Sequence, residues 1–233
     1  MKNVLVLAAC VSVLAVAAFA NGPLPYLTAT PTDVAGSGNH NSDVILVNNL
    51  VTSGGQVTNG LAGCAYFSSW LAFDYTPTTN TTVRQVTLDY IYNSTPLKAA
   101  INFRLYSGTN PGVGSIVRSW SVPAASYVEA NTGWVAFQRT VYRSTVPIPD
   151  QALTANTKYW FAYTSPNTAS PNIVYWCVQS TLKEEQVWWY LNSSWGTSLA
   201  KGAGGTYDQS YALDDSQVGV APTSFGKVKA LFN

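Results

Sequence analysis

Charged side chains are scarce in this chain of 233 residues: they make up 10% of it, and 12 basic residues nearly balance 11 acidic ones. A chain so close to neutral has no basic surface to attract nucleic acid or anionic lipid. Its surface must therefore consist mainly of Ser, Thr, Asn, Gln and Tyr. This composition suits a secreted β protein, and we expect no nucleic-acid partner.

Histidine is almost absent, which excludes the commonest catalytic sites. The single histidine, His40, stands between two asparagines in a polar N-terminal segment. A Ser-His-Asp or Cys-His site needs a base held rigidly beside the nucleophile. A catalytic zinc site needs several imidazoles or thiolates. We therefore expect a protein that is not an enzyme and has no catalytic residues.

Carboxylates are the remaining candidates for catalysis. A glycosidase needs two of them, facing each other across the substrate. Most acidic residues of this chain fall at predicted turns or strand ends, and only Asp74 and Asp89 fall within predicted strands. The alternation around Asp89 places its side chain on an outward face. A polysaccharide-active hydrolase or lyase is therefore the least favoured function.

The chain begins with a long apolar run. Residues 4–19 follow the basic Lys2 and end in the small-residue signal Ala18-Phe19-Ala20, which together predict a secretory signal peptide over residues 1–20. Polar and turn-forming residues follow at once, without a stop-transfer pattern. We therefore expect no membrane span in the mature chain, a flexible arm over residues 21–42, and a secreted or cell-surface location.

Cysteine is rare, and two cysteines remain after the predicted cleavage, Cys64 and Cys177. In an oxidising compartment such a pair can form a disulfide. Both lie in apolar, strand-like stretches that could face each other across a β-sandwich. We therefore expect a Cys64–Cys177 bridge; two buried free thiols are the alternative.

Helical periodicity is also missing, and alternation with a period of two takes its place. Residues 99–107 place Ile101, Phe103 and Leu105 on one face and polar side chains on the other. Similar alternation occurs in residues 64–75, 83–92, 133–142 and 157–164, and turns rich in Gly, Pro and Asn separate these segments. We predict ten to twelve short strands in an all-β fold: a single antiparallel, jelly-roll-like β-sandwich over residues 43–220, followed by a short tail over residues 221–233.

Several of these segments occur in an order that resembles a known family. The series is VILVNNL (44–50), FSSWLAFDYTPTTNTTVRQVTLDYIY (67–92), FRLYSGTNPG (103–112), LTANTKYWFAYT (153–164) and YDQSYALD (207–214). It resembles the choice-of-anchor R type of bacterial extracellular domain. The resemblance implies a secreted or surface-attached β-sandwich without established chemistry. The chain departs from that pattern at its end, where it carries no LPxTG-like motif.

One short stretch, QVWWYLNSSWG (186–196), concentrates aromatic residues. On a strand, Trp188 and Tyr190 point to one face, and Trp189 and Leu191 to the other. A turn follows, and Trp195 begins the return strand. One pair of rings should pack in the core, while the other pair and Trp195 are exposed and available to stack on a ligand such as a sugar. We therefore take Trp188, Trp189, Tyr190 and Trp195 as candidate ligand-binding residues; purely structural packing is the alternative.

Three acidic residues, Asp208, Asp214 and Asp215, lie close together near a glycine-rich loop. Calcium prefers six to eight oxygen ligands, several of them carboxylates. This cluster is a candidate site for a structural Ca²⁺, and no other cofactor is expected.

Together these features predict a non-catalytic secreted or cell-surface module that binds glycan or a partner protein through aromatic and polar side chains. The alternative is a structural component of an extracellular matrix or surface layer that associates with copies of itself.

Overall fold

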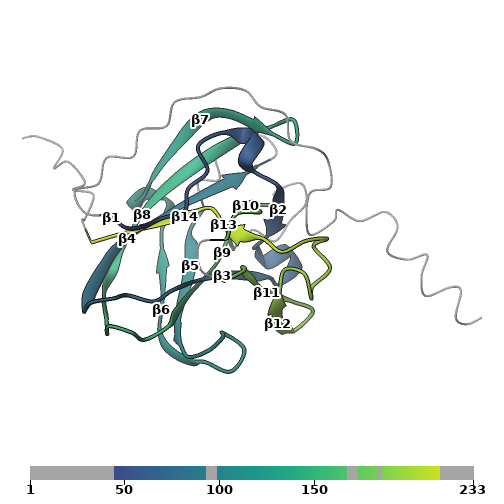
Figure 1. Cartoon of the computed structure of the whole chain (residues 1–233). Coiled ribbons are helices and arrows are strands. Elements are labelled where there is room, and N and C mark those ends of the chain that lie inside the picture. Colours follow the sequence, from purple (N-terminus) through teal and green to yellow (C-terminus); the bar gives the residue numbers. More distant parts are fainter. Residues whose placement is uncertain (1–44, 93–98, 167–172, 183–184, 216–233) are drawn as a thin grey trace, which may run out of the picture.

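The computed structural model describes residues 45–92, 99–166, 173–182 and 185–215 (Figure 1). The predicted signal peptide (1–20), the predicted arm (21–42) with His40, and the predicted tail (221–233) lie outside the described residues. No helix within the described ranges has the length and apolar character needed to cross a membrane.

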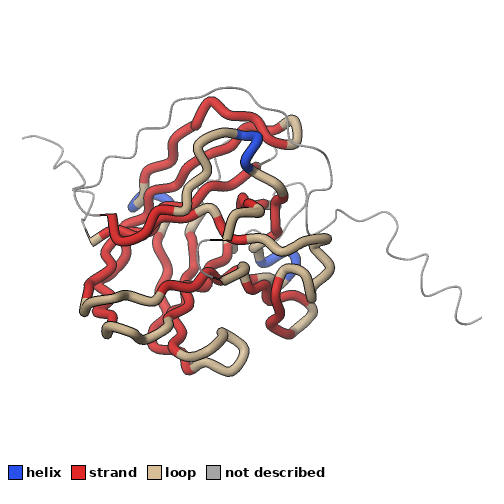
Figure 2. The backbone as a smooth tube through the Cα atoms, viewed as in Figure 1, coloured by secondary structure: helices blue, strands red, loops and turns tan. Residues whose placement is uncertain are grey.

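Nearly all regular structure is strand (Figure 2). Three 3₁₀ helices are short: η2 (Gly54–Gln56), η3 (Ala65–Phe67) and η4 (Ala124–Ser126). The strands are β1 (Ile45–Asn48), β2 (Asn59–Ala62), β3 (Trp70–Tyr75), β4 (Thr81–Ile91), β5 (Ile101–Ser107), β6 (Ser115–Val122), β7 (Val128–Ala136), β8 (Arg139–Leu153), β9 (Tyr159–Thr164), β10 (Tyr175–Gln179), β11 (Trp188–Leu191), β12 (Ser194–Thr197), β13 (Asp208–Gln209) and β14 (Tyr211–Asp214). These strands exceed the predicted ten to twelve because several are only two to four residues long.

The strands form two antiparallel sheets, which confirms the predicted β-sandwich. The six-stranded sheet has the order β12-β11-β3-β9-β5-β6. The eight-stranded sheet contains β1-β14-β4-β10-β13, with β2 paired to β10 and β8 paired to both β4 and β7. In Figure 1 the eight-stranded sheet lies above the six-stranded one. The chain passes repeatedly from one sheet to the other, so the strands that are neighbours in space are often distant in sequence.

The main core lies between the sheets, and the period-two pattern builds it. Ile101, Phe103 and Leu105 of β5 are buried there, as predicted. β9 contributes Phe161 and Tyr163 in the same way. Alternate residues of these strands consequently point to the outer face of the six-stranded sheet.

The hairpin of β11 and β12 confirms the turn predicted after Leu191. Asn192 and Ser193 have φ values of 54° and 61°, and Leu191 pairs with Ser194. Two positive φ values in a two-residue loop give a turn whose twist matches that of the flanking strands. The turn therefore sets the register that places Tyr190 opposite Trp195.

The outer face of the eight-stranded sheet, here called the covered face, lies beneath other parts of the chain. Val51 and Val57 from the β1–β2 connection and Trp134 from β7 form a second apolar cluster on it. Gly54 of that connection approaches the β7 backbone so closely that a Cβ atom there would lie 2.2 Å from the carbonyl oxygen of Val135. Only glycine permits this contact.

An ion pair is buried under the same cover. Arg143 of β8 donates to both carboxylate oxygens of Asp89 of β4, at 2.8 and 2.9 Å, and to the carbonyl oxygen of Val51 at 3.0 Å. The Ser210 hydroxyl donates to the same carboxylate at 2.6 Å. Asp89 does point to the outer face, as predicted, but it is fully buried there, because the β1–β2 connection closes over it.

The expected disulfide is also absent: Cys64 and Cys177 are buried free thiols. They do not face each other across the sandwich, because Cys177 lies on β10 and Cys64 follows β2, its neighbour in the same sheet. Cys177 pairs with Gly60, four residues from Cys64, which corresponds to roughly 13 Å along a strand. A disulfide needs Cα atoms within about 7 Å. Burial raises the pKa of both thiols, which keeps them protonated.

Candidate functional site

The outer face of the six-stranded sheet carries a layer of aromatic rings. Trp160 and Tyr106 are buried against the small residues Ala72 and Ala162. Half-buried rings pack over or beside them. We call this surface the aromatic face; its rings belong to Trp70, Tyr106, Trp160, Trp188, Tyr190 and Trp195. The covered face is closed by backbone segments, whereas the rings themselves form the surface here.

The aromatic face is curled. The ring centroids of Trp195 on β12 and Tyr106 on β5 are 6.0 Å apart, although β11, β3 and β9 lie between these strands. In a flat sheet the axes of these two strands would be about 19 Å apart, at about 4.8 Å per strand. The β5–β6 loop also reaches the hairpin, since a Cβ atom at Gly112 would lie 3.3 Å from the Trp195 Cβ. The curl and the loop make this side of the sheet concave.

A pocket of about 490 Å³ opens beside these rings. Trp70 and Tyr190, which pair in register across β3 and β11, contribute aromatic walls. Asn102 and Arg104 of β5 contribute polar groups. The remaining lining is mostly hydroxyl-bearing or small: Ala65, Ser68, Ser69, Thr164, Ser165 and Pro166. Flat apolar rings beside hydrogen-bonding groups suit a ligand that has both kinds of surface.

Arg104 is held by stacking. Its guanidinium carbon lies 4.2 Å from the centroid of the Trp70 ring. In register, Arg104 pairs with Ala162 on the intervening β9, so a small side chain leaves the space through which the arginine reaches Trp70. A stacked guanidinium uses its flat face against the ring and leaves its N–H donors free along its edge.

A charged cluster borders the aromatic face at Asp74. On β3 the outward residues are Trp70, Ala72 and Asp74 in turn. The Lys158 ammonium pairs with Asp74 at 3.3 Å and with Glu185, and it lies 5.7 Å from the Trp160 ring centroid. The Glu185 backbone N–H donates to the Asp74 carboxylate at 3.2 Å. Burial raises the pKa of Asp74, although this hydrogen bond and Lys158 act in the opposite direction.

The structure separates the aromatic residues singled out in the sequence. Trp188, Tyr190 and Trp195 belong to the aromatic face. Trp189 belongs instead to the core, where it is fully buried and donates to the Ala62 carbonyl oxygen at 2.9 Å. Sequence analysis missed Trp70 and Arg104 as site residues. The alternation along their strands places them on the outward face, but nothing local shows that β3, β5 and β11 share one surface.

The three aspartates proposed for Ca²⁺ have other contacts. Asp208 is buried and accepts from the Asn49 amide at 2.9 Å, and the buried Asp214 accepts from the Gln85 amide at 3.0 Å. Asp215 presents its carbonyl oxygen to Arg84. Among the residues that the structure describes, no three His, Cys, Asp or Glu side chains gather as a metal site. The calcium site stays a prediction.

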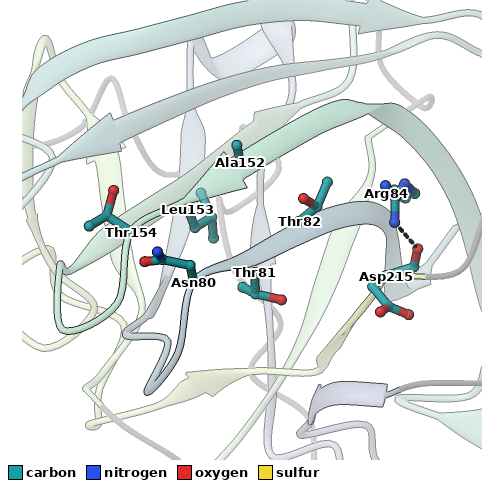
Figure 3. A pocket seen from close by; sticks show the side chains of 8 residues that line it. All are labelled: Asn80, Thr81, Thr82, Arg84, Ala152, Leu153, Thr154 and Asp215. Carbon is teal, nitrogen blue, oxygen red and sulfur yellow. Dashed lines mark hydrogen bonds between the residues drawn. The ribbon is translucent and has the colours of Figure 1, made fainter.

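A second pocket of about 490 Å³ lies where β4 begins and β8 ends (Figure 3). Its lining has no aromatic ring: Asn80, Thr81, Thr82, Arg84, Ala152, Leu153, Thr154 and Asp215. Arg84 is already engaged, because it donates to the Asp215 carbonyl oxygen at 3.0 Å and to the Asp150 carboxylate at 3.3 Å. The pocket beside the aromatic face is the better candidate for recognition.

Comparisons with known proteins do not identify this site. No protein-family model matches the chain, and no curated protein matches it. The resemblance to choice-of-anchor R domains therefore stays a prediction. Among solved structures, the chain is similar to the cysteine protease and lectin-like domains of Cwp84, a surface layer associated protein of Clostridium difficile, with a TM-score of 0.42 and 9% identity. That match covers 68% of this chain and 34% of the other, and at this TM-score it carries no argument about function.

Proposed function

We propose that this protein is a non-catalytic, secreted or cell-surface module that binds glycan through the aromatic face. One observation carries the proposal: Trp70 and Tyr190 stand beside Asn102 and Arg104 around one pocket on the aromatic face. Sugar rings present apolar C–H surfaces and a rim of hydroxyls. Aromatic side chains can stack on the first, and amide, hydroxyl and guanidinium groups can hydrogen-bond the second.

The charged groups near the face support a role without catalysis. A glycosidase needs one carboxyl group as an acid and a second as a base or nucleophile. Asp74 and Glu185, the carboxylates at the border of the face, share the ammonium group of Lys158. Asp89 is bound by Arg143 on the far side of the sandwich. The pocket lining itself contains no carboxylate.

The test is binding of residues 21–233 to a polysaccharide panel, measured by affinity electrophoresis and then by titration calorimetry. Trp70→Ala and Tyr190→Ala should each weaken binding by roughly fivefold or more, since stacking on an aromatic ring is worth about 1 kcal/mol or more. Near-UV circular dichroism checks that each variant is folded.

Tyr207→Ala is the matched control, because Tyr207 is a half-buried ring that packs against the main core and not on the aromatic face. It should bind like the wild type. Binding that is unaffected by Trp70→Ala and Tyr190→Ala, or no binding to any glycan, would contradict the proposal.

Self-association is the second candidate function, and the edge strand β6 favours it. β6 ends the six-stranded sheet, and Ile116 and Val117 on it are 55% and 54% exposed. Val113 in the preceding loop is 75% exposed. Exposed edge strands with apolar side chains pair readily with other strands. Light scattering should then show oligomers that Val117→Lys disperses, whereas a monomer at all concentrations would exclude this function.

A further inference from the structure

We infer that the ligand of the aromatic face is an acidic polysaccharide, and that Arg104 binds the carboxylate of one of its sugar residues in the pocket beside Trp70. This inference rests on the proposed function and names the class of glycan. Arg104, Trp70, Tyr190 and Asn102 carry it.

The charge of the pocket is the first observation. Arg104 is the one ionisable cation among the lining residues, and no Asp or Glu lines the pocket with it. Three of the other four arginines of the described ranges have protein oxygens as partners: Arg143 binds Asp89, Arg84 binds Asp150, and Arg118 donates to the Asp150 carbonyl oxygen. The fourth, Arg139, lies against the Tyr175 ring, with its guanidinium carbon 5.8 Å from the ring centroid, and it does not line the pocket. Arg104 has the Trp70 ring as its contact, and within the described residues it forms no ion pair. A half-buried guanidinium without an anion favours an anionic ligand.

The orientation of Arg104 is the second observation. With its guanidinium carbon 4.2 Å from the Trp70 centroid, the group is held against the ring. A guanidinium that contacts a ring through its face keeps its edge donors for a second partner, and two of those donors fit a carboxylate with parallel hydrogen bonds. Preorganisation by Trp70 also reduces the entropy that the arginine side chain loses on binding.

The neighbours of Arg104 fit the rest of a sugar residue. Asn102 lies two residues away on the same outward side of β5 and lines the same pocket. Its amide can donate to and accept from hydroxyls. Tyr190 stands across the pocket beside Trp70 and offers a ring on which the apolar side of the sugar can lie. A uronic-acid residue has all three features: a carboxylate, hydroxyls and an apolar ring face.

The experiment compares a polyuronate, such as polygalacturonate or alginate, with the same polymer after its carboxyl groups are reduced to alcohols. The wild-type protein should bind the acidic form at least tenfold more tightly, and added salt should weaken that binding. Arg104→Gln should lose this preference and bind both forms alike. Arg104→Lys keeps the charge but loses the planar pair of donors, so it should recover only part of the preference.

Arg118→Gln is the matched control. It removes one positive charge from an exposed residue of the neighbouring β6, so general electrostatic attraction falls equally in both variants. It should retain the wild-type preference for the acidic polymer.

The outcomes separate this inference from the proposed function. Equal binding of the two polymers, unchanged in Arg104→Gln but lost in Trp70→Ala, would overturn the inference and keep the glycan-binding function. Binding to sulfated polymers alone would also overturn it, because a planar carboxylate is then not the group recognised. No binding of the wild type to any polysaccharide would overturn both.

Discussion

The outer faces of the two sheets are covered in different ways. Each sheet must protect a second surface after the main core has formed. On the eight-stranded sheet, the β1–β2 connection and Trp134 cover the surface. Arg143, which is paired with Asp89, holds this cover in place by donating a hydrogen bond to the Val51 carbonyl oxygen. On the six-stranded sheet, aromatic rings form the layer beside the pocket, and the β5–β6 loop reaches the β11–β12 hairpin and accepts a hydrogen bond from Trp160. The first arrangement is suited to stability, and the second is the one that we propose for recognition.

The largest expected effect concerns the covered face. Arg143→Met should destabilise the protein by about 3–5 kcal/mol, because it leaves the fully buried Asp89 carboxylate without its cation. Urea unfolding followed by tryptophan fluorescence measures the change. Arg84→Met removes the cation of an exposed pair with Asp150 and should cost about 0–1 kcal/mol. Similar costs for the two variants would mean that the ion pair does not hold the cover in place.

A second prediction compares two neighbouring residues of β11. Trp189→Ala should cost about 3–5 kcal/mol, since it empties a buried site and removes the hydrogen bond to Ala62. Tyr190→Ala, on the aromatic face, should cost about 1 kcal/mol. Thermal and urea unfolding compare the two variants. If Tyr190→Ala proves as costly as Trp189→Ala, the aromatic face is a structural layer and the binding proposal loses its basis.

The alternation of residues predicted that Trp189 and Tyr190 face opposite sides of β11, although not which of them is buried, and it also placed Ile101, Phe103 and Leu105 in the core. It could not predict which strands become neighbours. The pairing of Asp89 with Arg143 joins residues 54 positions apart, and the cysteines failed to meet because β2 and β10 share one sheet. The pocket is lined by residues of four strands, β3, β5, β9 and β11, from distant parts of the sequence, so Trp70 and Arg104 carried no local signal of their role. The curl that brings Trp195 to Tyr106 is likewise a property of the whole sheet.

The cysteines provide a third test, which reports on the covered face. Cys64 and Cys177 both belong to the apolar cluster of the covered face, and burial raises the pKa of both thiols. A thiol reagent at neutral pH should therefore react slowly with native residues 21–233, and it should titrate two thiols after unfolding in urea without reductant. Asn102→Cys, placed on the aromatic face, should add one thiol that reacts at once. If the unfolded chain shows no reactive thiol, Cys64 and Cys177 are bridged and the predicted disulfide is correct.

The smallest expected effect concerns the border of the aromatic face, where Asp74 shares Lys158 with Glu185. Burial raises the pKa of Asp74 above its ordinary value of 3.8. A carboxyl group with a higher pKa in the folded state favours folding most below its unfolded pKa, and that contribution is lost as the pH rises through the folded value. Asp74→Asn removes this dependence. The stability of the variant relative to wild type should therefore increase as the pH rises from below 3.8 towards neutrality.

Urea unfolding at a series of pH values measures this relative stability, with Asp150→Asn, an exposed carboxylate, as the control for the loss of one negative charge. A relative stability of Asp74→Asn that instead falls as the pH rises would show that Lys158 stabilises the Asp74 carboxylate by more than burial destabilises it. The border of the aromatic face would then be held by an ion pair much as the covered face is. The contrast between the two faces would be confined to the rings and the pocket around Arg104.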